Sequence, residues 1–296
     1  MKFEFKKATK QKSKLRCAIF GPSGSGKTFT SLEIASGITS VDEKIALIDT
    51  ERGRASKHSK RFNFDVLELT DYSVDSYIAA INAAIAYDVL IIDSLSHCWQ
   101  KILEEVDKLA KTKYKNNSFR AWAEGTPLQK RLVNAILGFP GHIIATMRSK
   151  TEWVVESNDK GKSAPRRVGT TPEQGKGIEY EFDFIIEMNP DHVAEIWKGY
   201  DDFQDRIISK PTRVLGVEFV NWLEDGEDVP LITDDQLKRF NELVKNLNIS
   251  DKKVQKGLEM KGFSSKEKMT FEIAEMWINS LEERQKSENK NINQEL

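Results

Sequence analysis

The chain has 296 residues, with 45 lysines and arginines against 46 acidic residues and a formal net charge of −1. This length predicts one large domain plus a smaller one, and the balanced charge alone predicts neither a nucleic-acid nor a membrane partner. The cysteines, Cys17 and Cys98, lack metal-ligand spacing, so we expect reduced, buried thiols. No apolar segment is long enough to span a bilayer and no signal-peptide pattern is present, so we expect a cytoplasmic protein without a membrane partner.

The first fourteen residues are basic and poor in apolar side chains, and we expect them to form an arm. From residue 15 on, short apolar runs alternate with segments of helical periodicity, which predicts βαβ units in a mostly parallel sheet covered on both faces. The expected strands are 16–20, 44–49, 65–69, 89–93 and 142–147. Helices are expected at 28–38, 73–86, 97–113 and 127–138.

The second half of the chain differs in amino-acid composition from the first half. Residues 157–177 are rich in Gly, Ser, Pro, Lys and Arg, which predicts a long mobile loop. Strands at 182–188, 194–197 and 206–208, a short helix at 216–223 and an acidic linker complete a core over residues 15–226. Thr233, followed three residues later by Gln236, forms a capping sequence that opens a small helical domain over 227–285. We expect residues 286–296 to be a disordered tail.

The pattern Gly21-x-x-x-x-Gly26-Lys27-Thr28 lies between an expected strand and an expected helix, which is the context of a phosphate-binding P-loop. Backbone N–H groups of such a loop surround a phosphate at a helix N-terminus. Lys27 would reach the β/γ oxygens, and the Thr28 hydroxyl is a natural Mg²⁺ ligand. The expected nucleotide-binding residues are Gly21, Pro22, Ser23, Gly24, Ser25, Gly26, Lys27, Thr28 and Phe29.

Two further strands end in acidic residues. Val-Leu-Ile-Ile-Asp93 has the form of a Walker B strand, whose carboxylate would hold Mg²⁺ opposite Thr28, although an Asp here could also simply cap the next helix. Ring-type AAA+ ATPases usually carry a catalytic Glu directly after this Asp, where this chain has Ser94. Glu51, after the strand that ends at Asp49, is therefore the candidate general base, with a surface position as the alternative. A basic cluster at residues 52–61 follows, which could touch DNA or be solvated, and we interpret it as solvated.

These motifs occur in a fixed order over residues 15–215, followed by Lys150-Thr-Glu-Trp and Glu179-Tyr-Glu-Phe-Asp183. In this order the chain resembles the RecA-like ATPases, and most of all the short single-strand annealing and recombination ATPases of bacteriophages. The resemblance implies an α/β fold with a RecA-like P-loop core and a small C-terminal helical domain. It also implies ATP and Mg²⁺ as cofactors.

The same resemblance implies roles for other residues. Arg148 would be the sensor between the γ-phosphate and DNA, and Lys210 and Arg213 would complete a neighbouring subunit's site in a ring or filament. Phe5-Lys-Lys-Ala8 matches an element that docks onto the next protomer, and the helical domain would recruit a partner such as a single-stranded DNA-binding protein. The DNA-binding residues would be Lys160, Lys162, Arg166, Arg167 and Lys176.

We therefore expect an ATP- and Mg²⁺-dependent, DNA-stimulated ATPase that binds single-stranded DNA. It would promote annealing or homologous recombination in phage DNA metabolism, in the cytoplasm of the bacterial host. One alternative is a P-loop kinase of a small molecule, with Arg166 and Arg167 in a lid. Another is a non-enzymatic loader or scaffold in which the nucleotide only sets the conformation.

Overall fold

The computed structural model describes residue 5 and residues 7–39, 44–157, 163–260, 263 and 265–292, with side chains outside 151–168, 259–260 and 288–292. The described residues divide into two compact units. The larger unit spans Lys14–Leu223, and the smaller one combines residues before 14 with residues from Glu224 on. Each unit has its own hydrophobic core.

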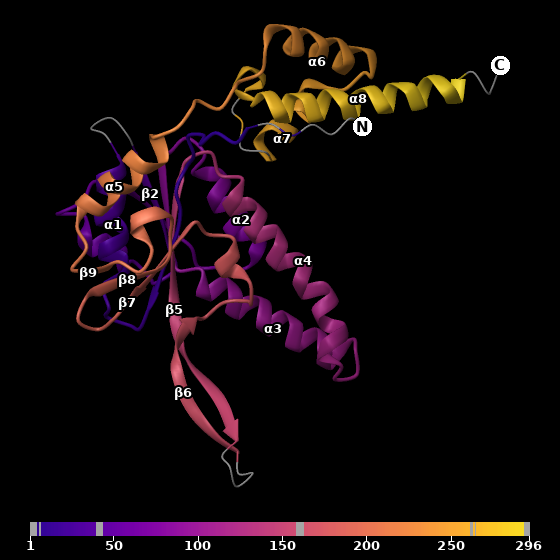
Figure 1. The fold of residues 1–296 in the computed structure, drawn as a ribbon. Coiled ribbons are helices and arrows are strands. Elements are labelled where there is room, and N and C mark those ends of the chain that lie inside the picture. Colours follow the sequence, from indigo (N-terminus) through magenta and orange to yellow (C-terminus); the bar gives the residue numbers. More distant parts are fainter. Residues whose placement is uncertain are drawn as a thin grey trace. The chain divides into compact units, whose positions relative to one another are not determined.

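The larger unit is built on one mixed sheet, which confirms the α/β fold class. Its strands run in the order β3-β2-β4-β5-β1-β7-β8-β9 (Figure 1). The first six of these strands are mutually parallel, and β7, β8 and β9 are joined by antiparallel pairing. Their bounds are β1 Arg16–Gly21, β2 Ile45–Asp49, β3 Asp65–Glu68, β4 Val89–Asp93, β5 His142–Ser157, β7 Phe184–Met188, β8 Val193–Lys198 and β9 Ile207–Ser209.

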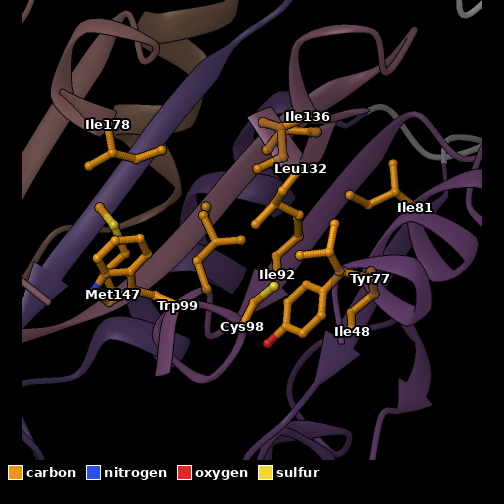
Figure 2. Packing of buried hydrophobic residues seen from close by; sticks show 14 of the residues in the cluster. Ile48, Tyr77, Ile81, Ile92, Cys98, Trp99, Leu132, Ile136, Met147 and Ile178 are labelled. Atoms are coloured by element: carbon orange, nitrogen blue, oxygen red, sulfur yellow. The ribbon is translucent and has the colours of Figure 1, made fainter. Parts of the chain in front are cut away.

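Helices cover both faces of this sheet (Figure 1). The helices α2 (Val74–Ala83), α3 (Ser96–Thr112) and α4 (Ser118–Leu137) cover one face, and α1 (Lys27–Ile38) and α5 (Arg213–Glu224) cover the other. Successive β1 residues alternate between the two cores, with Ala18 and Phe20 in one and Cys17 and Ile19 in the other. This double burial explains why the central strands read as continuous apolar runs. Figure 2 shows the core beneath α2–α4, where Tyr77 and Cys98 pack beside strand residues.

Two glycines let α1 and α5 approach each other closely. A Cβ on Gly37 would lie 1.9 Å from the carbonyl oxygen of Arg213, and a Cβ on Gly216 would lie 2.1 Å from that of Ile34. Both contacts involve backbone atoms, which cannot rotate away as a side chain can. The α1–α5 crossing therefore requires glycine at both positions.

Our prediction of a mobile loop at residues 157–177 is wrong for much of that segment. The strand β6 (Ser163–Pro172) pairs antiparallel with the outer half of β5, from Ser149↔Pro172 to Ser157↔Ser163. The resulting hairpin extends away from the sheet (Figure 1). Strand pairing is made by backbone hydrogen bonds, so a segment without a hydrophobic pattern in its sequence can still form a strand.

Helix α4 begins nine residues earlier than its expected start at Pro127. Asn117 caps it, since its side chain accepts a hydrogen bond from the backbone N–H of Arg120 at 3.0 Å. A proline inside a helix removes one backbone donor, and this normally marks a boundary. Here the packing of α4 on α3 outweighs that loss: at Gly125 even a Cβ would lie 2.4 Å from Val106.

The smaller unit contains α6 (Asp234–Asn246), α7 (Asp251–Met260) and α8 (Phe271–Ile292) around a core that includes Phe240 and Ile278. The predicted capping box of Thr233 and Gln236 is present at the start of α6. The tail expected from residue 286 is helical as far as Ile292, because Glu, Arg, Gln and Lys at 282–286 favour helix.

Residues of the N-terminal arm pair with the acidic segment that follows the core. Lys12 forms an ion pair with Asp228 at 2.6 Å, and Lys10 forms one with Asp225 at 3.7 Å. The backbone N–H of Lys12 donates to the carbonyl oxygen of Glu227. The arm therefore belongs to the smaller unit. No helix of the described residues is long and apolar enough to cross a membrane.

Candidate active site

A cavity of about 710 Å³ opens at the carboxyl ends of the parallel strands β1, β2, β4 and β5. Open α/β sheets hold their ligands at this edge, and the volume lies in the usual range for small-molecule sites. The lining residues are Gly21, Pro22, Ser23, Gly24, Gly26, Lys27, Thr28, Phe29, Glu51, Arg54, Lys57, His58, Asp93, Ser94, Arg148, Ser149 and Glu173. The cavity thus joins the P-loop, the Glu51 strand and the Asp93 strand in one place.

The loop between β1 and α1 has the backbone that its glycines predict. Gly24 and Gly26 have φ angles of 81° and 91°, in the left-handed region that favours glycine. A Cβ on Gly21 would lie 2.2 Å from the carbonyl oxygen of Met188. The Lys27 Nζ group donates to the carbonyl oxygens of Gly21 and Pro22 at 2.9 and 2.8 Å, so it lies folded against its own loop. Burial lowers the pKa of Lys27.

Ser25 is the one member of the expected nucleotide-binding set that does not line the cavity. Its side-chain oxygen is buried without a hydrogen-bond partner among the described residues. Its carbonyl oxygen lies 3.1 Å from His192 Nδ1, so a residue far along the chain supports the loop from behind.

Thr28 and Asp93 meet as the P-loop and Walker B patterns predict. The Thr28 hydroxyl donates to Asp93 Oδ2 at 2.6 Å, and the Thr146 hydroxyl donates to Asp93 Oδ1 at 2.5 Å. Burial raises the pKa of Asp93, and both hydroxyls oppose that rise. Ser94 Oγ lies in the same cavity, buried and without a hydrogen-bond partner among the described residues. These oxygen donors suit a small hard cation such as Mg²⁺.

Glu51 lies in the cavity at the centre of a polar network. Its Oε1 accepts a hydrogen bond from Arg148 Nη2 at 2.7 Å, and the same nitrogen donates to His97 Nε2 at 2.7 Å. Since Nε2 accepts, His97 is neutral and its Nδ1–H donates to Thr50 Oγ1 at 2.6 Å. The Tyr72 ring stacks on His97 with centroids 4.9 Å apart.

Opposing effects set the protonation of these groups. Burial raises the pKa of Glu51, but the hydrogen bond and charge of Arg148, together with the charge of Arg54, outweigh it and lower that pKa overall. Burial and the charge of Arg148 lower the pKa of His97, against the nearby carboxylates. The network therefore stabilises a charged Glu51 beside a neutral His97.

A family model described as an AAA domain matches residues 13–215, which is more than half of the chain. The chain belongs to this AAA-domain family. Membership indicates a nucleotide-binding P-loop ATPase, in agreement with the P-loop and Asp93 at the cavity. No curated protein matches the chain significantly. The RecA-like recombination type is narrower than this family and stays a prediction.

Arg148 connects the cavity of the AAA domain to the β5–β6 hairpin. It lies one residue before the first paired position of the hairpin, Ser149. Its backbone N–H donates to Ser96 Oγ at 2.9 Å, and its carbonyl oxygen accepts from the N–H of Glu173 at 2.7 Å. Gln174 in turn donates to the carbonyl oxygen of Leu95 at 2.9 Å. Hydrogen bonds at the start of one strand of the hairpin and just past the end of the other thus connect the hairpin to Leu95 and Ser96, close to Asp93 in the chain.

Those of the other predicted site residues whose side chains the structure describes do not line this cavity. Lys210 and Arg213 of the AAA domain are exposed and do not line it. Lys176 is exposed shortly after the hairpin. Arg166 and Arg167 belong to β6 by backbone register, and their side chains lie outside the description. Lys160 and Lys162 lie outside the described residues altogether.

Sequence reasoning missed several residues that line the cavity of the AAA domain. Arg54 and Lys57 belong to the basic cluster that we interpreted as solvated, and Glu173 lies in the expected mobile loop. Glu173 accepts a hydrogen bond from Gln100 at 3.0 Å. The useful signal was Asp49: its two carboxylate oxygens accept from the N–H groups of Glu51 and Ala55, which turns the basic segment back over the cavity.

Proposed function

We propose that this AAA domain is a Mg²⁺-dependent ATPase of the RecA-like recombination type, stimulated by single-stranded DNA. One observation carries the proposal: Arg148 contacts Glu51 inside the cavity and also begins the protruding β5–β6 hairpin. A ligand on the hairpin would therefore act on the group that holds Glu51.

ATP would bind with its phosphates on the P-loop, whose N–H groups lie at the N-terminus of α1. Lys27 would exchange the carbonyl oxygens of Gly21 and Pro22 for phosphate oxygens. Mg²⁺ held by Thr28 and Asp93 would neutralise charge on the terminal phosphates. Ser94 Oγ, which has no partner among the described residues, is free to bind a water or phosphate oxygen there.

Glu51 would act as the general base that takes a proton from the attacking water. In the structure its Oε1 is bound to Arg148 and its pKa is lowered, so it is a weak base. Transfer of Arg148 from Glu51 to the γ-phosphate would free the carboxylate and stabilise the charge that develops on that phosphate. His97, packed on Tyr72, would hold Arg148 near its place during this exchange.

The hairpin would bind the DNA backbone through Arg166, Arg167 and the neighbouring Lys160, Lys162 and Lys176. Such contacts do not read sequence and weaken with salt. The two ends of the hairpin are hydrogen-bonded to Leu95 and Ser96, two and three residues after Asp93. A shift of the hairpin would therefore move Arg148 relative to the cavity.

Further parts of the proposal concern assembly and place of action. Lys210 and Arg213 lie on exposed positions from which they would complete the site of a neighbouring subunit in a ring or filament. Phe5 is fully exposed, as a docking residue for another protomer would be. The helical unit would recruit a partner such as a single-stranded DNA-binding protein. The protein would promote annealing or recombination of phage DNA in the host cytoplasm.

The test is ATP hydrolysis with and without single-stranded DNA, at low and moderate salt. We expect stimulation that fades as salt rises and is lost in Lys27→Ala. The double variant Arg166→Ala/Arg167→Ala should lose the stimulation, whereas Lys108→Ala/Lys111→Ala, which removes two exposed charges on α3, should keep it. Hydrolysis that ignores DNA but responds to a small-molecule acceptor would favour a kinase. Nucleotide binding without hydrolysis would favour a scaffold.

A further inference from the structure

Five arginine and lysine side chains follow Glu51 within ten residues, namely Arg52, Arg54, Lys57, Lys60 and Arg61. The fold separates them into two groups. Arg54 and Lys57 line the cavity. The other three do not line it, and among them Arg61 forms an ion pair with Glu33 at 2.6 Å. Placement at the cavity is therefore selective and does not follow from basic composition alone.

The backbone of this segment is fixed at both ends. Asp49 accepts hydrogen bonds from the N–H groups of Glu51 at 2.6 Å and Ala55 at 3.0 Å, and Ala55 is completely buried. At the other end Phe62 packs on Phe29 of α1, with ring centroids 5.4 Å apart. The short 3-10 helix η1 (Ala55–His58) between these anchors is thus held over the cavity.

The cations of the cavity differ in how they are engaged. Lys27 is bound to backbone carbonyl oxygens, and Arg148 is bound to Glu51 and His97. Arg54 lies 3.5 Å from Glu51 Oε2 and is mostly exposed. For Lys57 there is no ion pair with any carboxylate in the part of the chain that the structure describes. A cavity wall with an unpaired cation fits an anionic ligand.

We propose that Arg54 and Lys57 bind the phosphates of the nucleotide in the same subunit, which rests on the ATP binding proposed above. Arg54 contacts Glu51, so it faces the terminal phosphate on which Glu51 would act. Lys57 also lines the cavity and directly precedes His58, whose ring packs on Phe29 in the first turn of α1 with ring centroids 5.9 Å apart. We therefore assign Lys57 to an inner phosphate. The site thereby has phosphate-binding cations of its own before any neighbour contributes one.

The test is titration calorimetry of the full chain with Mg·ATP and with Mg·ADP. Loss of one charge-assisted contact should raise a dissociation constant about tenfold. Arg54→Ala should weaken ATP binding by about that factor and ADP binding by less than about twofold, because ADP lacks the terminal phosphate. Lys57→Ala should weaken both. Lys60→Ala is the matched control, since Lys60 lies in the same segment but off the cavity, and it should change neither.

Arg54→Lys and Lys57→Arg should keep most of the affinity, which separates a charge effect from misfolding. Wild-type affinity in Arg54→Ala and Lys57→Ala would overturn the inference and leave the ATPase proposal intact. An equal loss in Lys60→Ala would overturn it as well, because the effect would then come from overall charge. If the wild-type chain binds neither nucleotide, the proposed function itself fails.

Discussion

Acid should destabilise the AAA domain through His142, the first residue of β5. Its ring is buried, and Nδ1 accepts a hydrogen bond from the backbone N–H of Leu15 at 3.1 Å. Burial, with the charges of Lys14 and Arg16, lowers the pKa of His142 from 6.5 to about 3. Between these values the unfolded chain binds a proton that the folded chain does not, so stability falls as pH drops from 6.5 towards 3.

From pH 7 to pH 5 this single group should remove roughly 2 kcal/mol from the free energy of unfolding. That is a large share of the 5–15 kcal/mol typical of a domain. His142→Asn keeps a side-chain oxygen acceptor for Leu15 but does not titrate in this range. Urea unfolding at both pH values should therefore show the wild type losing about 2 kcal/mol more than the variant. An equal loss in the two proteins would refute the reasoning.

Three further predictions concern the site and its support. Glu51→Gln should lower ATP hydrolysis in single turnovers by about 100-fold or more, while calorimetry finds ATP affinity within about threefold of wild type; parallel losses would contradict a general base. Gly216→Ala should cost about 3 kcal/mol or more in thermal unfolding, because its Cβ would lie 2.1 Å from a carbonyl oxygen of α1, whereas Gly169→Ala, with open space around it, should cost far less. Arg148→Met should raise the pKa of His97 in an NMR titration, since the Arg148 charge lowers it; an unchanged midpoint would argue against their contact.

Much of the fold could be predicted from the sequence because the central strands are buried on both faces. The strand β4 was predicted with the bounds that the structure gives it, since the four residues before Asp93 are all apolar. The P-loop was readable because its glycines occupy backbone conformations that other residues rarely adopt. Local physical chemistry decides these features, so a single sequence suffices.

The hairpin and the start of α4 could not be predicted, since neither depends on a pattern in its local sequence. The strand β6 is defined by its antiparallel pairing with β5, a partner that its own sequence does not reveal. Helix α4 continues through Pro127 because of its packing on α3. In both elements tertiary contacts override what the local sequence favours.

The contacts within the site were only partly predictable. Glu51 and Arg148 are 97 residues apart, and their hydrogen bond follows from the strand order β2-β4-β5, which brings the ends of these strands to one edge. Strand order is set by the whole sheet, so a motif can place each residue at that edge but cannot pair them. Arg54 and Lys57 were missed because a basic cluster has no periodic pattern that would show which of its side chains line the cavity.

The pairing of Lys10 and Lys12 with Asp225 and Asp228 gives the chain an interleaved architecture. Along the sequence the AAA domain lies between the two parts of the smaller unit, one before residue 14 and one from residue 224 on. A truncation that removes the residues before 14 would keep the larger unit whole, yet it would remove the lysine partners of Asp225 and Asp228. Clones meant to isolate the helical unit therefore need the residues before 14 joined by a short linker to the segment from residue 224 on.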